Sequence, residues 1–326
     1  MKSYLLTGSA GFIAYKVADL LLKDGHAVYG VDKIDDAYDV RLKHYRLDLL
    51  RKHPNFHFLK ADIADRDIIA SLSDFLPESV DGVINLAARA GVRTSLSDPW
   101  VYVDTNVTGT LNMLELCRQR GIPKFVLAST SSLYAEVSAP PFKENYDTDH
   151  PLQPYAATKK GAESLAHAYH HLYGVDVTVL RYFTVYGPAG RPDMVMFRFC
   201  QWISEGKPVV VNGDGEQSRG FTYLDDIARG TILALKPLGY EIINLGGHQV
   251  ITINQLIHML EERLGKKANV TYAPFHTADV HTNQADVGKA RELLGWQPQV
   301  DLAVGVDRLV AWYLQERAWV KDVETP

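Results

Sequence analysis

The start of the chain constrains the fold most, because it places a glycine-rich turn between an apolar strand and an amphipathic helix. Residues 4–7 (Tyr-Leu-Leu-Thr) are the apolar run, Gly8 and Gly11 make the turn, and apolar residues recur at helical spacing from residue 13 to residue 21. Gly8 permits a tight turn, and Gly11 lets the backbone approach a pyrophosphate at the positive N-terminal end of the helix. Ala14 still allows the helix to pack closely on the strand. This order of strand, turn and helix predicts a dinucleotide-binding site.

An acidic residue ends the second predicted strand, which covers residues 26–31. That residue, Asp32, lies about 20 positions past the glycines, where an acid receives the ribose hydroxyls of an adenosine. Because a carboxylate there repels a 2′-phosphate, we predict NAD rather than NADP as the cofactor. Lys33 comes directly after it and opposes this preference. Asp62, after the third predicted strand, is placed to meet the adenine edge.

Strand and helix patterns alternate through the first half of the chain, which is typical of a parallel sheet with helices on both faces. We therefore predict an α/β fold, with a doubly wound parallel sheet of the Rossmann type that binds NAD over residues 1–185. The segment 33–54 is expected to be a charged insertion with a solvated helix at its centre. Further strands are predicted at residues 56–59, 81–88, 125–128 and 175–180, and helices at residues 99–119 and 154–173.

The alternation loosens after residue 187, and a smaller α/β substrate-binding lobe is predicted over residues 186–326. No linker separates this lobe, and its strands and helices interrupt one another, so we expect it to be interwoven with the first domain. Its helices are predicted at residues 194–205, 225–235, 253–264 and 302–316, and its strands at residues 208–211, 242–245 and 270–272.

Tyr155 and Lys159 are the candidate catalytic pair, because they lie four positions apart on one predicted helix and share a face. A phenol is a poor base at neutral pH, since its pKa is near ~10. A neighbouring ammonium is expected to lower that pKa. The Thr130 hydroxyl, at the end of the preceding strand, can hold a substrate oxygen in line for proton transfer. The three groups can remove a proton from a sugar hydroxyl while hydride leaves the same carbon.

Composition argues against several other classes of protein. The formal net charge of −5 gives no basic footprint for nucleic acid, and no apolar run approaches the ~18 residues of a membrane span. Cys117 and Cys200 have no metal-ligand spacing and are expected to be reduced, and the 12 histidines show no zinc pattern. We expect a cytoplasmic enzyme without a metal, a nucleic-acid partner or a membrane association.

Several segments along the chain carry a resemblance to a known family: Gly8–Ala14, Asp32, Leu86–Ala88, Asn106, Ala128–Tyr134, Tyr155–Lys159, Arg181–Pro188, Gly190–Met194, Gly213–Gly215, Arg219–Asp226 and Asn244–Gly246. They resemble the extended short-chain dehydrogenases/reductases, over nearly the whole chain. Within that family the chain is most similar to the NAD-dependent nucleotide-sugar 4-epimerases, and nearest to those that act on UDP-glucuronate.

The resemblance implies that Tyr155 is the base, Lys159 its partner and Thr130 the hydroxyl that bridges substrate and tyrosine. It also implies a UDP-sugar substrate, a place in polysaccharide biosynthesis, and a homodimer that pairs the helices 99–119 and 155–173. The cofactor-binding residues are then Gly8, Gly11, Phe12, Ile13, Asp32, Lys33, Asp62, Ile63, Leu86, Ala87, Ala88, Asn106, Tyr155, Lys159 and Tyr182. The substrate-binding residues are Arg93, Ser131, Ser132, Thr184, Arg191, Arg219 and Asp279.

The reactions of this family begin with oxidation to a 4-keto sugar, and a second catalytic group selects the next chemical step. Dehydratases of the family carry Asp-Glu after the bridging Thr, and decarboxylases carry Glu two positions after it, whereas Thr130 is followed by two serines. The ketone can then turn over and take hydride on its other face, which predicts reversible C4 epimerisation of UDP-glucuronate to UDP-galacturonate with tightly bound NAD. Decarboxylation to UDP-xylose and epimerisation of UDP-glucose and UDP-galactose remain alternatives. A sugar reductase and a nucleotide sensor without catalysis also stay open.

The choice of a uronate depends on hydroxyl-bearing residues. Thr184 stands where relatives that act on neutral hexoses commonly have Asn, and with Ser131 and Ser132 it offers three hydroxyls around one anion. Hydrogen bonds to a charged acceptor are stronger than neutral ones. Arg191 adds a positive charge on the loop that closes the substrate side. These residues are expected to fix the substrate carboxylate.

The nucleotide half of the substrate is assigned by resemblance alone. Arg219 resembles the diphosphate-binding arginine of the family, although Gly220 comes next where the family usually has Asp. Asp279 resembles the acid that holds the uridine ribose. His276 stands where many relatives have a basic residue.

Overall fold

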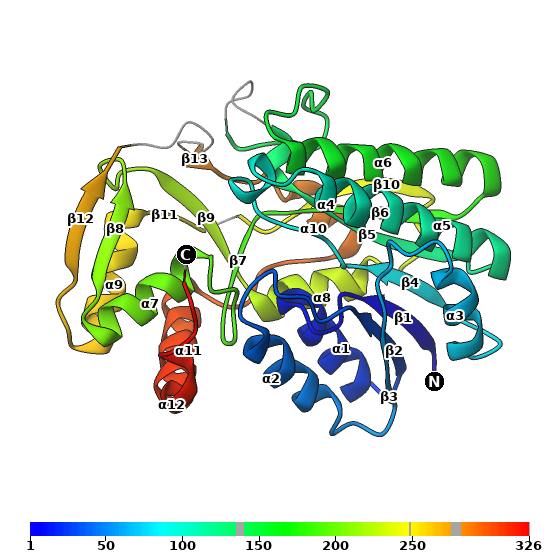
Figure 1. The fold of residues 1–326 in the computed structure, drawn as a ribbon. Coiled ribbons are helices and arrows are strands. Elements are labelled where there is room, and N and C mark those ends of the chain that lie inside the picture. Colours follow the sequence, from blue (N-terminus) through cyan, green and yellow to red (C-terminus); the bar gives the residue numbers. More distant parts are fainter. Residues whose placement is uncertain (135–139, 248, 275–281, 326) are drawn as a thin grey trace.

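The structure is a computed structural model that describes residues 1–134, 140–247, 249–274 and 282–325. Its centre is a seven-stranded parallel sheet in the order β10-β6-β5-β4-β1-β2-β3 (Figure 1). This confirms the predicted doubly wound fold, and the strand order reverses between β1 and β4, where open α/β sheets bind ligands. The strands are β1 (Ser3–Thr7), β2 (Ala27–Asp32), β3 (Phe56–Lys60), β4 (Gly82–Asn85), β5 (Lys124–Thr130), β6 (Asp176–Tyr182) and β10 (Tyr240–Leu245).

Side chains of the central strands alternate between two buried cores, one on each face of the sheet. Leu5 and Leu6 of β1 are both wholly buried but belong to different cores, and Phe125 and Val126 of β5 divide in the same way. Burial on both faces explains why these strands are continuous apolar runs in the sequence. One core is covered by α1 (Phe12–Lys23), α2 (Val40–Leu50), α8 (Leu224–Leu233) and α10 (Gly288–Leu294), and the other by α3 (Ile68–Phe75), α5 (Gly109–Arg120) and α6 (Pro154–Tyr173).

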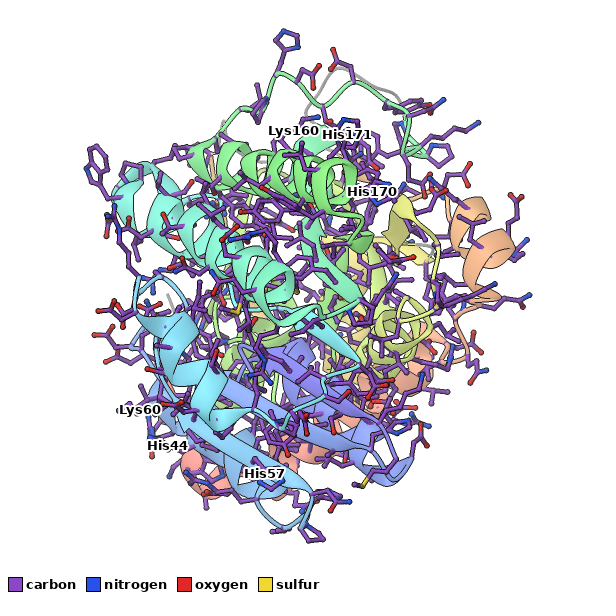
Figure 2. The ribbon with its side chains drawn as sticks, turned by 90° about the vertical axis from the view of Figure 1, so that its right-hand side faces the viewer. His44, His57, Lys60, Lys160, His170 and His171 are labelled. Atoms are coloured by element: carbon purple, nitrogen blue, oxygen red, sulfur yellow. The ribbon has the colours of Figure 1, made fainter. Side chains whose placement is uncertain are left out.

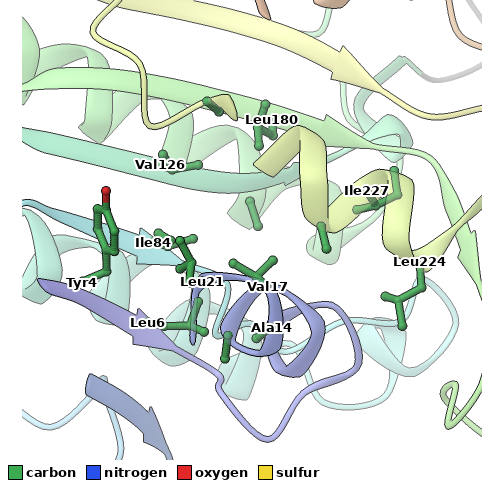
Figure 3. Close-up of a cluster of buried hydrophobic side chains, with 14 of the residues drawn as sticks. Tyr4, Leu6, Ala14, Val17, Leu21, Ile84, Val126, Leu180, Leu224 and Ile227 are labelled. Atoms are coloured by element: carbon green, nitrogen blue, oxygen red, sulfur yellow. The ribbon is translucent and has the colours of Figure 1, made fainter. Parts of the chain in front are cut away.

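The core on the α1 side joins parts of the chain that are far apart in the sequence. In Figure 3, Val17 of α1 faces Leu224 and Ile227 of α8, and side chains from β1, β4, β5 and β6 belong to the same cluster. Since α8, α10 and β10 come from the second half of the chain, the two halves are packed into the same layers. A domain division at residues 185 and 186 stays a prediction.

Two short sheets and four helices of the described residues build a second, smaller unit. One sheet has the strand order β11-β9-β13 with β7 also paired to β9, and the other pairs β12 with β8. The strands β7, β9, β11 and β13 were not predicted. The elements are β7 (Thr184–Tyr186), α7 (Val195–Glu205), β8 (Pro208–Asn212), β9 (Ser218–Tyr223), β11 (Gln249–Thr252), α9 (Ile253–Leu264), β12 (Asn269–Ala273), β13 (Thr282–Asn283), α11 (Leu302–Gln315) and α12 (Arg317–Val320).

Helix α2 differs from the solvated helix expected within residues 33–54. The Arg46 side chain is wholly buried, and its Nε and Nη2 both donate to the Ala189 carbonyl, at 2.9 and 2.7 Å. Further hydrogen bonds reach the carbonyls of Ala10, at 3.0 Å, and Gly190, at 3.1 Å, and the Tyr38 hydroxyl, at 2.7 Å. The guanidinium therefore ties the glycine turn to the loop that precedes α7.

The helix predicted over residues 99–119 is present but not uniform. A short helix α4 (Trp100–Tyr102) leads into a π-helical segment, Val103–Thr108, and then into α5. Such π segments occur often at functional sites. The segment carries Asn106 toward the end of β4.

Candidate active site

A cleft of about 1180 Å³ lies at the carboxyl ends of the strands, where the strand order reverses. Its size suits a ligand larger than a simple sugar. Most of the predicted cofactor-binding residues line it, namely Gly8, Gly11, Asp32, Lys33, Asp62, Ile63, Leu86, Ala87 and Ala88. Arg191 and Asp193 line the same cleft. The structure thus brings together the glycine turn, the acidic strand end and the small residues after β4.

The glycine turn leaves no room for side chains at its two key positions. Gly8 has φ +68°, and a Cβ on it would lie 2.8 Å from the Ala87 Cα and nitrogen atoms. A Cβ on Gly11 would lie 2.8 Å from the Gly8 carbonyl oxygen. Phe12 and Ile13 come next as the first two residues of α1, so the turn ends at a helix N-terminus. This cradle fits a dinucleotide pyrophosphate.

Asp32 is held in a fixed orientation beside the turn. Its Oδ2 accepts from the Ala10 N–H at 3.1 Å and its Oδ1 from the Ile34 N–H at 2.8 Å. Burial raises the pKa of the carboxyl, and Lys43 and the two N–H donors oppose that rise. The Lys33 ammonium lies 3.3 Å from carboxylate oxygens of both Asp35 and Asp62. Because Lys33 is paired with two anions, it opposes the NAD preference of Asp32 less than its sequence position indicates.

Tyr155, Lys159 and Thr130 meet at the end of β5. Helix α6 begins at Pro154, so Tyr155 and Lys159 lie one turn apart, and the Tyr155 phenol lies close enough to the Thr130 hydroxyl for that hydroxyl to lower its pKa. Burial raises the pKa of Tyr155, opposed by Thr130 and by the nearby Arg191 charge. Burial outweighs both contributions, so the pKa of the phenol in the protein alone lies above its ordinary value. The charge that lowers this pKa is that of Arg191, rather than that of Lys159 as expected.

The Lys159 ammonium is buried without a partner among the residues that the structure describes. Its side chain is 2% exposed, and none of the residues that the structure describes forms a hydrogen bond or ion pair with it. Burial lowers its pKa to about 8, and Glu163 opposes that shift. A buried cation with unused donors, one helical turn from Tyr155, fits a ligand that supplies oxygen acceptors, such as the ribose of a nucleotide.

Two predicted cofactor residues use their side chains elsewhere. The Asn106 oxygen accepts from the Arg89 N–H at 2.9 Å, and its amide donates to the Arg89 carbonyl and to Thr158 Oγ1, both at 3.0 Å. Asn106 thus fastens the stretch after β4 to α6. The Tyr182 hydroxyl lies 2.8 Å from Thr231 Oγ1 within the core, so only its backbone remains to face a cofactor.

The predicted carboxylate-binding residues lie on two neighbouring strand ends. Thr130 pairs with Tyr182 in the register of β5 and β6, so Ser131 comes directly after one strand end and Thr184 two positions after the other. Thr184 itself pairs with Phe221 of β9. Thr130 donates to Ser132 Oγ at 3.1 Å, and Ser131 Oγ accepts from the Asn283 amide at 3.2 Å. In each contact the serine accepts, which leaves its own proton free to be donated to a ligand.

Arg191 lies close enough to Tyr155 for its charge to lower the pKa of the phenol. Its guanidinium is held by Asp193 in a two-pronged ion pair, with Nε–Oδ1 at 3.0 Å and Nη2–Oδ2 at 2.6 Å. Nη2 also donates to the Ala90 carbonyl at 3.4 Å. Asp193, which no sequence pattern singled out, therefore sets the direction of the predicted substrate arginine.

The remaining predicted residues lie on the side of the smaller unit. Both Arg93 Nη atoms approach the side-chain oxygen of Asn212, at 2.9 and 3.3 Å. Arg219 lies on β9 beside Asn283 of β13, and its Nη1 donates to the Ser218 carbonyl at 2.8 Å. Asp279 and His276 lie outside the residues that the structure describes.

A buried ion pair next to Lys159 was not predicted from the sequence. Glu163, one turn further along α6, pairs with Arg181 of β6 at 2.8 Å, and both side chains are almost completely buried. The only signal in the sequence was that Glu163 stands four residues after Lys159 on the same helix. Charged side chains at that spacing usually pair on the solvent-exposed surface of a helix, so the spacing did not indicate burial.

Histidines and lysines do not gather into a metal site. Figure 2 labels six of them, and they fall into separate groups, with Lys160, His170 and His171 on α6 and His44, His57 and Lys60 near α2 and β3. In the described part of the chain, no group of three or more His, Cys, Asp or Glu side chains is placed to hold a metal ion. Nor does any helix among those residues have the length and apolar character needed to cross a membrane.

Comparison with known proteins gives a consistent result. Residues 4–246 match the family described as the NAD dependent epimerase/dehydratase family. The chain is 56% identical over 325 residues to a UDP-glucuronate 4-epimerase of Thermodesulfobacterium geofontis, covering 99% of this chain and 100% of that protein. It is 38% identical over 332 residues to a probable UDP-glucuronate 4-epimerase of Rhizobium meliloti, covering 96% of this chain and 97% of that protein.

Solved structures agree with these relatives. A UDP-glucuronic acid 4-epimerase of Bacillus cereus, in complex with UDP-glucuronic acid and NAD, superposes with a TM-score of 0.90 at 37% identity, over 96% of this chain and 99% of that one. A UDP-glucose 4-epimerase of Thermotoga maritima with UDP-glucose gives a TM-score of 0.89 at 32% identity, over 97% and 99%.

Proposed function

The chain belongs to the NAD dependent epimerase/dehydratase family, and on that premise we propose that it interconverts UDP-glucuronate and UDP-galacturonate by inverting carbon 4 of the sugar. One observation carries the proposal. Tyr155 and Thr130 meet at the end of β5, Lys159 lies one helical turn from Tyr155, and the Arg191 charge reaches the phenol. Ser131 follows Thr130 directly, and Thr184 comes two positions after Tyr182, the strand partner of Thr130. This arrangement offers acid–base chemistry and an anion site at one place.

The cofactor is NAD, which would be held by the glycine turn, Asp32 and Lys159. When bound, it supplies the oxidising and reducing capacity at carbon 4. Tyr155 removes the proton of the 4-hydroxyl as hydride leaves carbon 4. It later returns a proton to the same oxygen, after the ketone has turned over so that hydride re-enters on its other face. Thr130 holds the reacting oxygen against the phenol, and the Lys159 ammonium stabilises the phenolate.

The residues after Thr130 favour epimerisation over the related reactions. Ser131 and Ser132 lie in the turn after β5, and neither can act as the acid that elimination or assisted decarboxylation needs. A 4-keto uronate is a β-keto acid and loses its carboxylate when that bond aligns with the ketone. A carboxylate fixed by several hydrogen bonds resists this alignment. Decarboxylation to UDP-xylose is the main alternative reaction. Its product distinguishes it from epimerisation.

We expect Thr184→Val to raise the KM for UDP-glucuronate about tenfold, since a hydrogen bond to a charged acceptor contributes about 1.5 kcal/mol or more. Leakage to a UDP-pentose should also increase, because the carboxylate is held less rigidly. Steady-state kinetics with product analysis by NMR measures both effects. Thr184→Ser is the matched control, because it keeps the hydroxyl. An unchanged KM and product ratio in Thr184→Val would remove Thr184 from the carboxylate site.

The substrate itself is tested with a panel of UDP-sugars. Purified protein without added cofactor should convert UDP-glucuronate to UDP-galacturonate, followed by proton NMR. UDP-glucose should react poorly, because its neutral CH₂OH leaves the hydroxyl and arginine donors without an anion. UDP-xylose as the main product would establish the decarboxylase instead. Efficient interconversion of UDP-glucose and UDP-galactose would leave only a general 4-epimerase.

We also propose a homodimer formed through α4, α5 and α6. Helices α5 and α6 lie side by side on the outer face of the sheet (Figure 1). Large apolar side chains are exposed on this layer, among them Trp100, at 77%, and Leu172, at 64%. Exposed apolar groups of this size mark interaction surfaces when they gather on one layer.

Trp100→Glu should convert the dimer to a monomer in sedimentation velocity, because it places a charge in the apolar contact. Leu314→Glu is the control, since Leu314 is 50% exposed but lies on α11. A monomeric wild type, or a Trp100→Glu variant that remains dimeric, would contradict this interface. The cytoplasmic location and the place in polysaccharide biosynthesis stay predictions.

A further inference from the structure

Helix α6 carries three functional side chains in line rather than two. Tyr155, Lys159 and Glu163 occur at intervals of four residues, so they lie on the same face of the helix. Lys159 is 2% exposed and Glu163 is 3% exposed. The proposed reaction uses the first two side chains and leaves the buried carboxylate of Glu163 without a role.

The Glu163 carboxylate is held by three hydrogen bonds from other elements. Its Oε1 accepts from the Ser129 hydroxyl and from Arg181 Nε, the latter at 3.0 Å, and its Oε2 accepts from Arg181 Nη2 at 2.8 Å. Ser129 and Arg181 face each other in the register of β5 and β6. With both oxygens bound, Glu163 cannot turn toward Lys159, and the two side chains form no ion pair within the described residues.

Arg181 is in turn anchored away from Lys159. Its Nη1 donates to the Tyr134 hydroxyl at 3.2 Å and to the Glu144 carbonyl at 3.3 Å, and its Nη2 also donates to Thr148 Oγ1 at 3.4 Å. The pair therefore joins β5, β6, α6 and the segment around residue 144. A buried ion pair is weak evidence for stability, because desolvation offsets most of its attraction. Its position beside a buried ammonium that has no partner in the described part of the chain indicates a different use.

We propose that Glu163, clamped by Arg181 and Ser129, is a positioning residue that keeps Lys159 charged while leaving its ammonium out of an ion pair, one helical turn from Tyr155. The inference rests on the role proposed above for Lys159. An unclamped carboxylate one turn away would capture the ammonium in an ion pair and draw it from Tyr155. Without the carboxylate, a cation buried to this extent loses its proton more readily. The clamp satisfies both requirements at once.

The other charged or titratable groups around this pair are few among the described residues. Tyr155 lies on the same helix, and its ring contacts Tyr102 of α4 edge to face. Tyr134 comes after β5, Tyr240 of β10 donates to the Glu163 carbonyl at 3.4 Å, and Arg191 with Asp193 lies on the loop before α7. Glu163 favours the charged form of Lys159, which burial opposes. Loss of the Glu163 charge must therefore move the loss of the Lys159 proton to lower pH.

The test compares the pH dependence of kcat in wild type, Glu163→Gln and Ser129→Ala. In Glu163→Gln, kcat should fall at the alkaline end of the profile about one pH unit lower than in wild type, because Lys159 loses its proton earlier. A shift of this size is typical of removing one nearby charge. Ser129→Ala should move this alkaline limb in the opposite direction by less, because one donor to the carboxylate is removed. Glu163→Asp should restore most of the wild-type limb. If Glu163→Gln fails to fold, the sign of the Ser129→Ala shift decides.

Asp176→Asn is the matched control. Asp176 pairs with the buried Lys124 at the opposite ends of the same two strands, β5 and β6. This variant should lose stability and leave the alkaline limb in place. The proposal would be overturned if the alkaline limb of kcat lay at the same pH in all folded variants. It would also be overturned if Asp176→Asn moved that limb as far as Glu163→Gln does.

A binding measurement separates this inference from the proposed reaction. The affinity of the apoprotein for NAD, measured by calorimetry across the same pH range, should weaken at lower pH in Glu163→Gln than in wild type. That readout needs no turnover. If the protein does not epimerise UDP-glucuronate but NAD affinity weakens at lower pH in Glu163→Gln, the positioning role of Glu163 is supported and the proposed substrate is wrong. If the pH dependence of NAD affinity is the same in Glu163→Gln and in wild type, the positioning role of Glu163 is contradicted, whatever the substrate is.

Discussion

Tyr155→Phe should lower kcat at least a hundredfold while the fold and NAD binding persist. The substitution removes only the oxygen that exchanges a proton with the substrate, and positioned acid–base groups contribute about 10²–10⁴-fold. The ring keeps its edge-to-face contact with Tyr102, at 6.1 Å between centroids, so packing is preserved. Turnover of UDP-glucuronate, thermal melting and NAD content of the purified variant give the three readouts.

Tyr102→Phe is the matched control for that experiment. Its hydroxyl donates to the Gly91 carbonyl at 2.9 Å and lies 2.6 Å from Thr94 Oγ1, so its contacts are structural. We expect this variant to keep turnover within a few-fold of wild type. Retention of more than about a hundredth of the rate by Tyr155→Phe would contradict its role as the base.

Arg46→Ala should lower the free energy of unfolding by about 4 kcal/mol, because it leaves several buried acceptors without a donor at about 1–3 kcal/mol each. The carbonyls of Ala10, Ala189 and Gly190 lose their partner, although the Tyr38 hydroxyl can reorient. NAD affinity should fall as well, since the glycine turn and the loop before α7 are no longer joined. Urea unfolding and calorimetry at neutral pH measure the two effects.

Arg51→Ala serves as the control on the neighbouring turn. Its side chain is 53% exposed and its ion pair with Asp48 spans 3.3 Å, so the change in stability should stay within about 0.5 kcal/mol. A loss of less than about 1 kcal/mol in Arg46→Ala would show that water replaces the guanidinium without cost, and that Arg46 is not a structural tie.

The large sheet could be predicted because its signals are local. Each central strand is an apolar run next to a turn, and burial on both faces makes that run continuous. Helix α9 was predicted with its observed bounds, since the apolar stripe begins after Thr252, whose hydroxyl accepts from the Gln255 N–H in a capping box. By contrast, β7 and β13 are three and two residues long, and β9 is paired by strands from three distant segments. Such pairing leaves no pattern in a short window.

The candidate site shows the same difference between local signals and contacts between distant segments. Tyr155 and Lys159 were predicted because one helix fixes their spacing, and Thr130 because a strand end precedes that helix. The burial of Arg46 was not predicted, because its acceptors lie up to 144 positions away and the residue stands in a charged segment. Asn283 donates to Ser131 across 152 positions. Contacts of this range are products of the whole fold, so a sequence pattern cannot show them.

The fate of the hydrogen at carbon 4 tests the central claim most directly. UDP-glucuronate that carries deuterium at carbon 4 is incubated with the purified protein in ordinary water, and the product is examined by NMR. If carbon 4 is oxidised and reduced again within the closed site, UDP-galacturonate should form with the deuterium still on carbon 4. Formation of UDP-galacturonate with hydrogen from the solvent at that carbon, or of no UDP-galacturonate at all, would contradict the account.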